Sequence, residues 1–149
     1  MGQLMQGVGL TPLKIITNEL GNVMHALKKS EDTFTSFGEV YFSLIKEGAR
    51  KGWKKHHDMV LNIVVPCGKI RFTIFDDRVD SSSYKQYSIF ELSPSENYQR
   101  LTIHPGLWVA FEGIYKGDSI LLNISSIEHD PNEAETCSID SGIIEYPTF

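Results

Sequence analysis

The residues best suited to chemistry lie in one short segment, residues 51–57, which reads Lys-Gly-Trp-Lys-Lys-His-His. Imidazole titrates near neutral pH, so His56 is a candidate general base or general acid. His57 is its neighbour, and neighbours on a strand point to opposite faces, so at most one of these histidines faces an interior. Lys54 shares the face of His56 if the segment is extended, and a partly desolvated lysine there can bind an anion or lose its proton more easily.

The other candidate groups are scattered along the chain. Trp108 follows a turn and is suited either to stack on a sugar or a base or to serve as a core aromatic. His129 and Asp130 are adjacent, and a carboxylate beside an imidazole can orient the ring. The sequence contains no phosphate-binding glycine loop, no dinucleotide-binding fingerprint and no nucleophile elbow, so these enzyme classes have no support.

No metal site is expected from the sequence. A zinc site needs three or four converging ligands, and apart from the neighbours His56 and His57 the histidines are scattered along the chain. Cys67 and Cys137 have no CxxC spacing, and two distant thiols are more typical of a reducing compartment than of a disulfide framework.

Composition limits the class of protein and its partners. A chain of 149 residues with 41% hydrophobic and 22% charged residues predicts one soluble domain, residues 1–149. The net charge of −5 argues against nucleic acid as the main partner, although the lysines of residues 51–55 could bind a small phosphate ligand. No apolar run approaches the ~20 residues of a membrane helix. Without a secretory signal pattern at the N-terminus, a cytoplasmic location is expected.

Short strands broken by turn residues must position these groups. Residues 59–65 form a nearly continuous apolar run typical of a buried strand. In the strand expected at residues 69–75, Ile70, Phe72 and Ile74 alternate with Lys69, Arg71 and Thr73. Further strands are expected at residues 13–17, 23–27, 38–45, 87–92, 98–103, 107–111 and 119–124. Only residues 11–20 and 130–136 have helical character. Roughly eight to ten short strands predict an all-β sandwich or barrel, which can hold one small ligand in its mouth.

Four blocks of sequence carry a resemblance to a known family. They are GEVYFS (38–43) with KGWKKH (51–56), GKIRF (68–72) with DDR (76–78), LTIHPGLWVAF (101–111), and DPNE (130–133) with IEYP (144–147). Their order and spacing resemble the dTDP-4-dehydrorhamnose 3,5-epimerase family of cupins and its sugar 3,4-ketoisomerase relatives. The resemblance spans nearly the whole chain. It implies a cupin jelly-roll fold (a double-stranded β-helix barrel), no metal or organic cofactor, a nucleotide-diphosphate sugar as ligand, and a homodimer.

The resemblance also implies roles for individual residues. In an ungapped alignment Lys54 matches the proton-abstracting histidine of the family, and His56 matches the second histidine of the ketoisomerase H-x-H motif. Val109 stands at a second family histidine, and Asn123 lies near the tyrosine that acts as an acid on the opposite face. His56 and Lys54 are therefore the expected catalytic residues. The expected substrate-binding residues are Lys51, Arg71, Trp108, Asn123, His129 and Asp130.

The implied activity is metal-independent epimerisation or isomerisation of a nucleotide-linked 4-keto-6-deoxy sugar for cell-envelope polysaccharide such as lipopolysaccharide. Deprotonation beside a ketone needs a base and a group that stabilises the enolate, for which His56 and Lys54 are the candidates. Valine cannot transfer a proton and asparagine is a poor acid, so one-centre epimerisation, 3,4-ketoisomerisation and non-catalytic sugar-nucleotide binding all stay open. A metal-dependent cupin is a third, more distant alternative.

Overall fold

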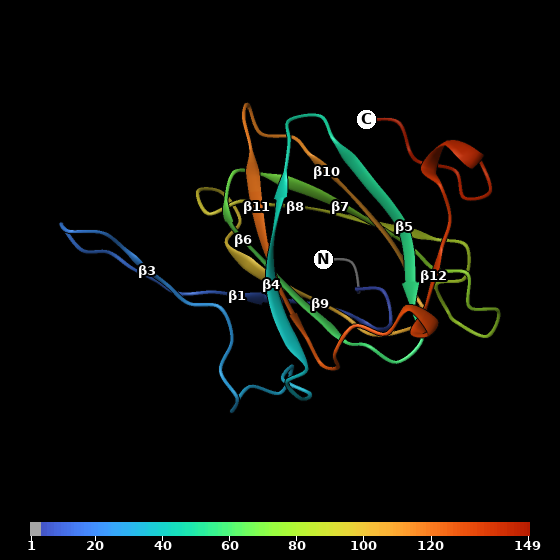
Figure 1. The fold of residues 1–149 in the computed structure, drawn as a ribbon, viewed down its shortest axis with the longest axis horizontal. Coiled ribbons are helices and arrows are strands. Elements are labelled where there is room, and N and C mark those ends of the chain that lie inside the picture. The colour runs from blue at the N-terminus through green and yellow to red at the C-terminus, as the bar shows by residue number, and fades with distance from the viewer. Residues whose placement is uncertain (1–3) are drawn as a thin grey trace.

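Two five-stranded antiparallel sheets face each other and form the body of the protein. The computed structural model describes residues 4–149 (Figure 1). We call the first the β4 sheet; it contains, in order, β1 (Val8–Pro12), β9 (Gln99–Ile103), β6 (Leu61–Cys67), β11 (Ser119–Ser125) and β4 (Glu39–Ile45). We call the second the β5 sheet; it contains β12 (Ala134–Thr136), β5 (Arg50–His56), β10 (Trp108–Gly113), β7 (Ile70–Phe75) and β8 (Tyr87–Leu92).

The core fills the space between the two sheets. Ile70, Phe72 and Ile74 point into it from β7, as the alternation of this segment predicts, and all three are fully buried. Leu61 and Ile63 face them from β6. The predicted all-β class is confirmed by this arrangement.

The helix predicted at residues 11–20 is wrong, and the one predicted at residues 130–136 is met only by one short turn. Residues 11–20 form no helix: β1 ends at Pro12, and the β-branched pair of β2 (Ile15–Ile16) instead joins β3 (Val23–Met24) in a hairpin that projects from the body (Figure 1). Residues 130–136 form one short 3-10 turn, η1 (Pro131–Glu133), and then the strand β12, because their backbone pairs with β5. A second 3-10 turn, η2 (Ile139–Ser141), follows. None of the helical turns in residues 4–149 has the length and apolar content needed to cross a bilayer.

A buried arginine anchors the segment that follows the projecting hairpin. Arg100 lies on the outer face of the β4 sheet, where its guanidinium donates to Ala26 O (2.6 Å), Glu31 Oε2 (2.5 Å) and Thr33 Oγ1 (2.6 Å). The side chain is fully buried, so this segment covers the β9 end of the outer face. The β4 end of the same face stays open, and Phe42 is 72% exposed there.

Candidate functional site

A cavity of about 330 Å³ opens between the two sheets beside β4 and β5. Side chains from both sheets line it, so a bound molecule has one wall on each side. The apolar part of the lining consists of Leu61, Ile63, Val109, Phe111 and Leu121. The polar part consists of Tyr41, Ser43, Lys51, Lys54, His56 and Asn123.

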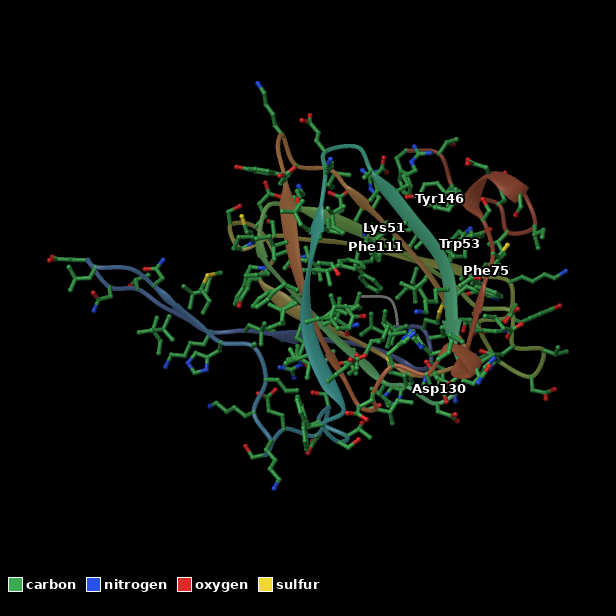
Figure 2. The ribbon with its side chains drawn as sticks, in the orientation of Figure 1. Lys51, Trp53, Phe75, Phe111, Asp130 and Tyr146 are labelled. Carbon is green, nitrogen blue, oxygen red and sulfur yellow. The ribbon has the colours of Figure 1, made fainter. Side chains whose placement is uncertain are left out.

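A β-bulge at Gly52 brings three functional side chains to the same side of β5. Lys54 pairs with Val109 and Lys51 pairs with Phe111, so two residues of β5, Gly52 and Trp53, lie opposite the single residue Ala110 of β10. Gly52 has φ +138°, and a Cβ there would lie 2.6 Å from the Ala110 Cβ, so only glycine is accommodated. The bulge resets the alternation, so Lys51 lines the cavity together with Lys54 and His56. Lys51 lies beside Phe111, its cross-strand partner on β10 (Figure 2).

His56 is held by a buried carboxylate on η1. Its Nδ1 contacts Glu133 Oε1, and the side chains of the two residues are only 11% and 5% exposed. The other carboxylate oxygen of Glu133 accepts from the backbone N–H groups of Asp58 (3.2 Å) and Met59 (3.3 Å). A carboxylate only accepts hydrogen bonds, so the His56 ring carries its proton on Nδ1 and keeps a free lone pair on Nε2.

The surroundings set the charge of both members of this pair. Burial lowers the pKa of His56, and the hydrogen bond to Glu133 raises it by less, so the pKa lies below its ordinary value of 6.5. Burial raises the pKa of Glu133, but the hydrogen bonds from His56 and from two backbone N–H groups outweigh it and hold the pKa below 4.5. At neutral pH the pair is therefore a neutral imidazole and a carboxylate, which is the form a general base needs.

The opposite wall of the cavity comes from the β4 sheet. Tyr41 and Asn123 are direct cross-strand partners on β4 and β11, and Asn123 Nδ2 donates to the Tyr41 hydroxyl oxygen at 2.8 Å. Ser43 lies two residues along β4 and lines the same wall. The cavity therefore has a cationic and imidazole wall on one side and a neutral hydroxyl and amide wall on the other.

Two of the predicted substrate-binding residues lie on the outer face of the β5 sheet, away from this cavity. Trp108 packs with Trp53 and Ala110, and its Nε1 donates to Asp77 Oδ2 at 2.8 Å. Arg71 pairs with Glu91 and Glu112. Both residues occupy outward positions in the alternation of their strands, which is why neither lines the cavity.

His129 and Asp130 are both exposed beside η1. The Asp130 carboxylate accepts from Asn132 N at 2.9 Å and caps η1, the turn that carries Glu133. The two adjacent residues form no dyad; the carboxylate that orients an imidazole here is Glu133, and the imidazole is His56. The positive charge that His129 can carry also contributes to the low pKa of His56.

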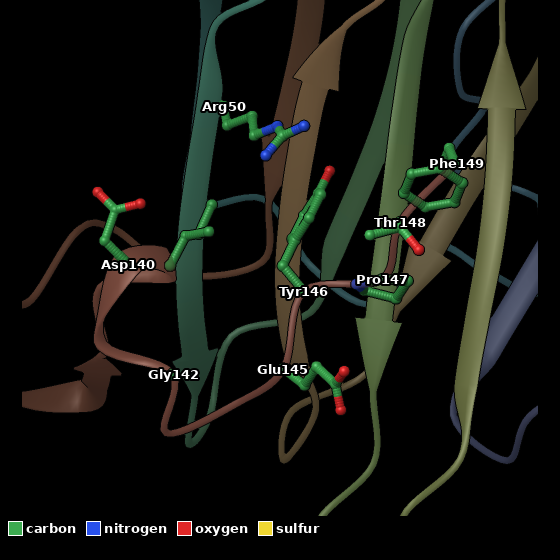
Figure 3. Close-up of a pocket in the computed structure, with 9 residues that line it drawn as sticks. Arg50, Asp140, Gly142, Glu145, Tyr146, Pro147, Thr148 and Phe149 are labelled. Atoms are coloured by element: carbon green, nitrogen blue, oxygen red, sulfur yellow. The ribbon is translucent and has the colours of Figure 1, made fainter.

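A larger cavity of about 540 Å³ lies under the C-terminal residues, on the outer face of β5 (Figure 3). The Tyr146 ring packs against Trp53 in a tilted arrangement there, and the Arg50 guanidinium lies 4.9 Å from the Tyr146 ring centre. Of its lining side chains that carry charge, Arg50 is paired with Glu112, while Asp140 and Glu145 repel anions. The smaller cavity is the better candidate because its imidazole, two ammonium groups and a phenol converge on one space.

The arrangement around His56 is suited to move a proton on a bound carbon acid. Nε2 is a neutral base held in one orientation, and Lys51 and Lys54 supply positive charge for an anionic ligand or a developing oxyanion. Within residues 4–149, no three His, Cys, Asp or Glu side chains come together as a metal site. Cys67 and Cys137 are free thiols.

Glu133 and Tyr41 are the site residues that sequence reasoning missed. Glu133 is 77 positions from His56, and no local spacing relates the two. Tyr41 lies in a strand whose alternation is weak, because its outer face is also apolar. The pairing of β12 with β5 brings Glu133 to His56, and the pairing of β4 with β11 brings Tyr41 to the cavity. A single sequence does not reveal strand pairing.

Known proteins with the same architecture identify the family. No protein-family model matches the chain. A curated relative, the probable low-salt glycan biosynthesis epimerase of Haloferax volcanii, is 25% identical over 125 residues, which are 83% of this chain and 80% of the relative. The dTDP-4-dehydrorhamnose 3,5-epimerase of Sulfolobus tokodaii shares the fold, with a TM-score of 0.83 and 23% identity over 99% of this chain and 85% of that one.

A closer match covers nearly all of both chains. The crystal structure of a dTDP sugar isomerase from Desulfovibrio desulfuricans superposes with a TM-score of 0.92 and is 30% identical, over 96% of this chain and 91% of that chain. The resemblance seen in the sequence blocks is thereby confirmed. The protein belongs to the dTDP-4-dehydrorhamnose 3,5-epimerase-like family of cupins.

Proposed function

We propose that the protein is an epimerase or isomerase of a nucleotide-linked 4-keto-6-deoxy sugar in glycan biosynthesis. The observation that carries this proposal is the neutral His56 imidazole, buried against Glu133 and facing a cavity that also holds two lysines. Family membership supports the same conclusion, because the relatives are named as a dTDP sugar isomerase and a glycan biosynthesis epimerase.

The cavity suggests a role for each group. His56 Nε2 removes the proton from the carbon beside the sugar carbonyl. The Lys54 ammonium stabilises the enolate oxygen that forms, since the positive charge of a partly buried side chain is worth more than one in bulk water. Lys51, which lies on the other side of the Gly52 bulge from Lys54, binds a diphosphate oxygen. The apolar side chains of β6 and β11 face the C6 methyl group of the deoxy sugar.

Turnover of a defined substrate tests the proposal. Incubation with dTDP-4-keto-6-deoxyglucose, followed by proton NMR, should show a new sugar isomer that depends on the enzyme. dTDP is the first nucleotide to try because the relatives carry it in their names. If the sugar binds, as measured by calorimetry, but no isomer forms, the protein is instead a non-catalytic sugar-nucleotide-binding cupin.

Glu133→Gln tests how the buried carboxylate supports His56. We expect kcat/KM to fall roughly 10- to 100-fold, because the variant loses the charge that orients the ring and stabilises the imidazolium formed during the reaction. Loss of this charge also lowers the pKa of His56 further. Since the neutral imidazole is the active form, the acidic limb of the pH profile should move to lower pH.

The pH profile separates this role from a structural one. A variant that loses activity only through poor folding would keep the acidic limb of the wild-type protein. Glu135→Gln is the matched control, because Glu135 is half-exposed on β12 and contacts Lys55 and His57 on the outside. An unchanged acidic limb in Glu133→Gln would contradict the proposed pairing.

A homodimer and a cytoplasmic location are also part of the proposal. The outer face of β4 exposes Val40, Phe42 and Leu44, a row of apolar side chains that a second copy would bury. Light scattering should give about twice the chain mass of 16.8 kDa. Phe42→Glu places a charge in this row and should yield monomers, whereas a monomeric wild-type protein would rule the dimer out.

A further inference from the structure

We infer that Tyr41 is the acid that returns a proton to the sugar on the face opposite His56, so that the enzyme inverts a carbon rather than only moving the carbonyl group. This inference rests on the proposed function. It assigns a catalytic role to a residue on β4 that lies in the GEVYFS block but has no role in the sequence analysis, and it chooses between the two reactions that the motifs leave open.

The position of Tyr41 across the cavity is the first reason. His56, Lys54 and Lys51 all belong to β5, so they approach a bound sugar from one wall. Tyr41 belongs to β4, the edge strand of the other sheet, and lines the facing wall. Inversion of a carbon requires that the proton leaves from one face and arrives at the other, so the second group must come from this wall.

The chemistry of the facing wall is the second reason. Its polar side chains are Tyr41, Ser43 and Asn123. An asparagine amide does not act as a proton donor to carbon, and an aliphatic hydroxyl is a far weaker acid than a phenol. Tyr41 is therefore the one group of the three that can protonate an enolate carbon.

The hydrogen bond from Asn123 is the third reason. Asn123 Nδ2 donates to the Tyr41 oxygen at 2.8 Å, so the hydroxyl is an acceptor in this contact and its own proton is free to point elsewhere. Asn123 is buried beside Tyr41 on the neighbouring strand, which holds the amide in place. Asn123, which lies near the position of the family tyrosine, instead orients a tyrosine from the next strand.

The proton inventory of the reaction balances without another reactant. His56 Nε2 takes the proton from the carbon, and the electron pair of the C–H bond becomes the enolate. The Tyr41 O–H bond then breaks as a new C–H bond forms on the other face. The tyrosinate regains a proton from solvent through the open mouth of the cavity, and the imidazolium releases its proton to solvent.

The same geometry argues against simple ketoisomerisation. Moving a carbonyl to the adjacent carbon needs proton transfers that one base can perform on one face of the enediol. That reaction does not require a second acid on the facing wall. Its presence is explained if the product carries an inverted centre.

Tyr41→Phe tests the inference in deuterated water with dTDP-4-keto-6-deoxyglucose. The variant should still incorporate deuterium beside the carbonyl within about tenfold of the wild-type rate, because His56 is intact. The rate of inversion should fall by about 10²- to 10⁴-fold, the usual contribution of a positioned acid. Deuterated substrate of unchanged configuration should therefore accumulate. Tyr115→Phe, the same change on an exposed loop residue, is the matched control.

The outcomes separate this inference from the proposed function. If Tyr41→Phe inverts the carbon at the wild-type rate, or if it loses deuterium exchange together with inversion, the assignment of Tyr41 is wrong. A wild-type product with a displaced carbonyl and no inverted centre would overturn it as well. If the wild-type protein shows neither exchange nor inversion, the proposed function itself has failed.

Discussion

Replacing His56 with alanine is expected to lower kcat/KM for a nucleotide-linked 4-keto-6-deoxy sugar by about 10²- to 10⁴-fold, the usual contribution of a positioned general base. Of the residues within 4–149 that line the cavity, His56 alone carries an imidazole, so no second histidine among them can replace it. The lysines beside it are poor substitutes, because an ammonium group has no lone pair with which to accept a proton. Steady-state kinetics measured at fixed pH check this prediction.

His57→Ala is the matched control for this experiment. The two histidines are neighbours, but His57 is exposed and contacts Glu135 on the outside. Its alanine variant should keep kcat/KM within about twofold of the wild type, since surface changes away from a site rarely matter. Comparable losses in both variants would mean that the segment, rather than the His56 base, limits activity. Equal melting temperatures show that the comparison concerns folded protein.

Asp76→Asn is expected to lower the free energy of unfolding by about 3 kcal/mol. The amide that replaces the buried carboxylate carries no charge, and its NH2 group cannot accept the hydrogen bonds that the carboxylate oxygen accepts. Asp76 is fully buried at the start of the loop between β7 and β8. It accepts from Arg78 Nε (2.8 Å), Ser81 Oγ (2.6 Å) and Ser83 Oγ (2.5 Å). Denaturant unfolding measures the loss, and the melting temperature should fall by roughly 6 to 12 °C.

The pH dependence of this effect has a defined sign. Burial raises the pKa of Asp76, but the hydrogen bonds from Arg78, Ser81 and Ser83 outweigh it and hold the pKa well below the ordinary value of 3.8. Its stabilisation is fully present above that ordinary value and is lost as the pH falls through the lower, folded-state pKa. The difference between wild type and Asp76→Asn should therefore narrow below about pH 4.

An exposed residue of the same loop provides the control for stability. Asp80 is exposed, so Asp80→Asn makes the same chemical change without removing a buried charge. We expect its unfolding midpoint to match that of the wild type at every pH. A difference between wild type and Asp76→Asn that stays constant down to pH 2 would contradict the account of Asp76.

The strands with simple patterns are the part of the fold that the sequence predicts well. The alternation of residues 69–75 and the apolar run at 59–65 correspond to β7 and β6, because burial of one or both faces leaves a direct mark on the sequence. β5 has no such mark. Its cavity face is charged, and the bulge at Gly52 interrupts the period of two, so the strand that carries the site resembles a loop.

The candidate site is predictable in part for the same reason. The Lys51 to His56 segment draws attention by its residue types, and its spacing places Lys54 and His56 on one face. The partners of His56 and the facing wall depend on which strands pair, and pairing is set by the whole fold. Trp108 is expected in the site from its residue type alone, because an aromatic side chain is suited to contact a sugar. In the structure it packs on the outer face of its sheet with Trp53.

Deuterium incorporation is the measurement that tests the central claim most directly. The wild-type protein, incubated in deuterated water with dTDP-4-keto-6-deoxyglucose, should place deuterium on the carbon beside the carbonyl, and His56→Ala should place almost none there. Mass spectrometry of the sugar reads out both. A wild-type enzyme that forms an isomer without taking up deuterium, or a His56→Ala variant that exchanges as fast as the wild type, would contradict the claim that His56 is the base.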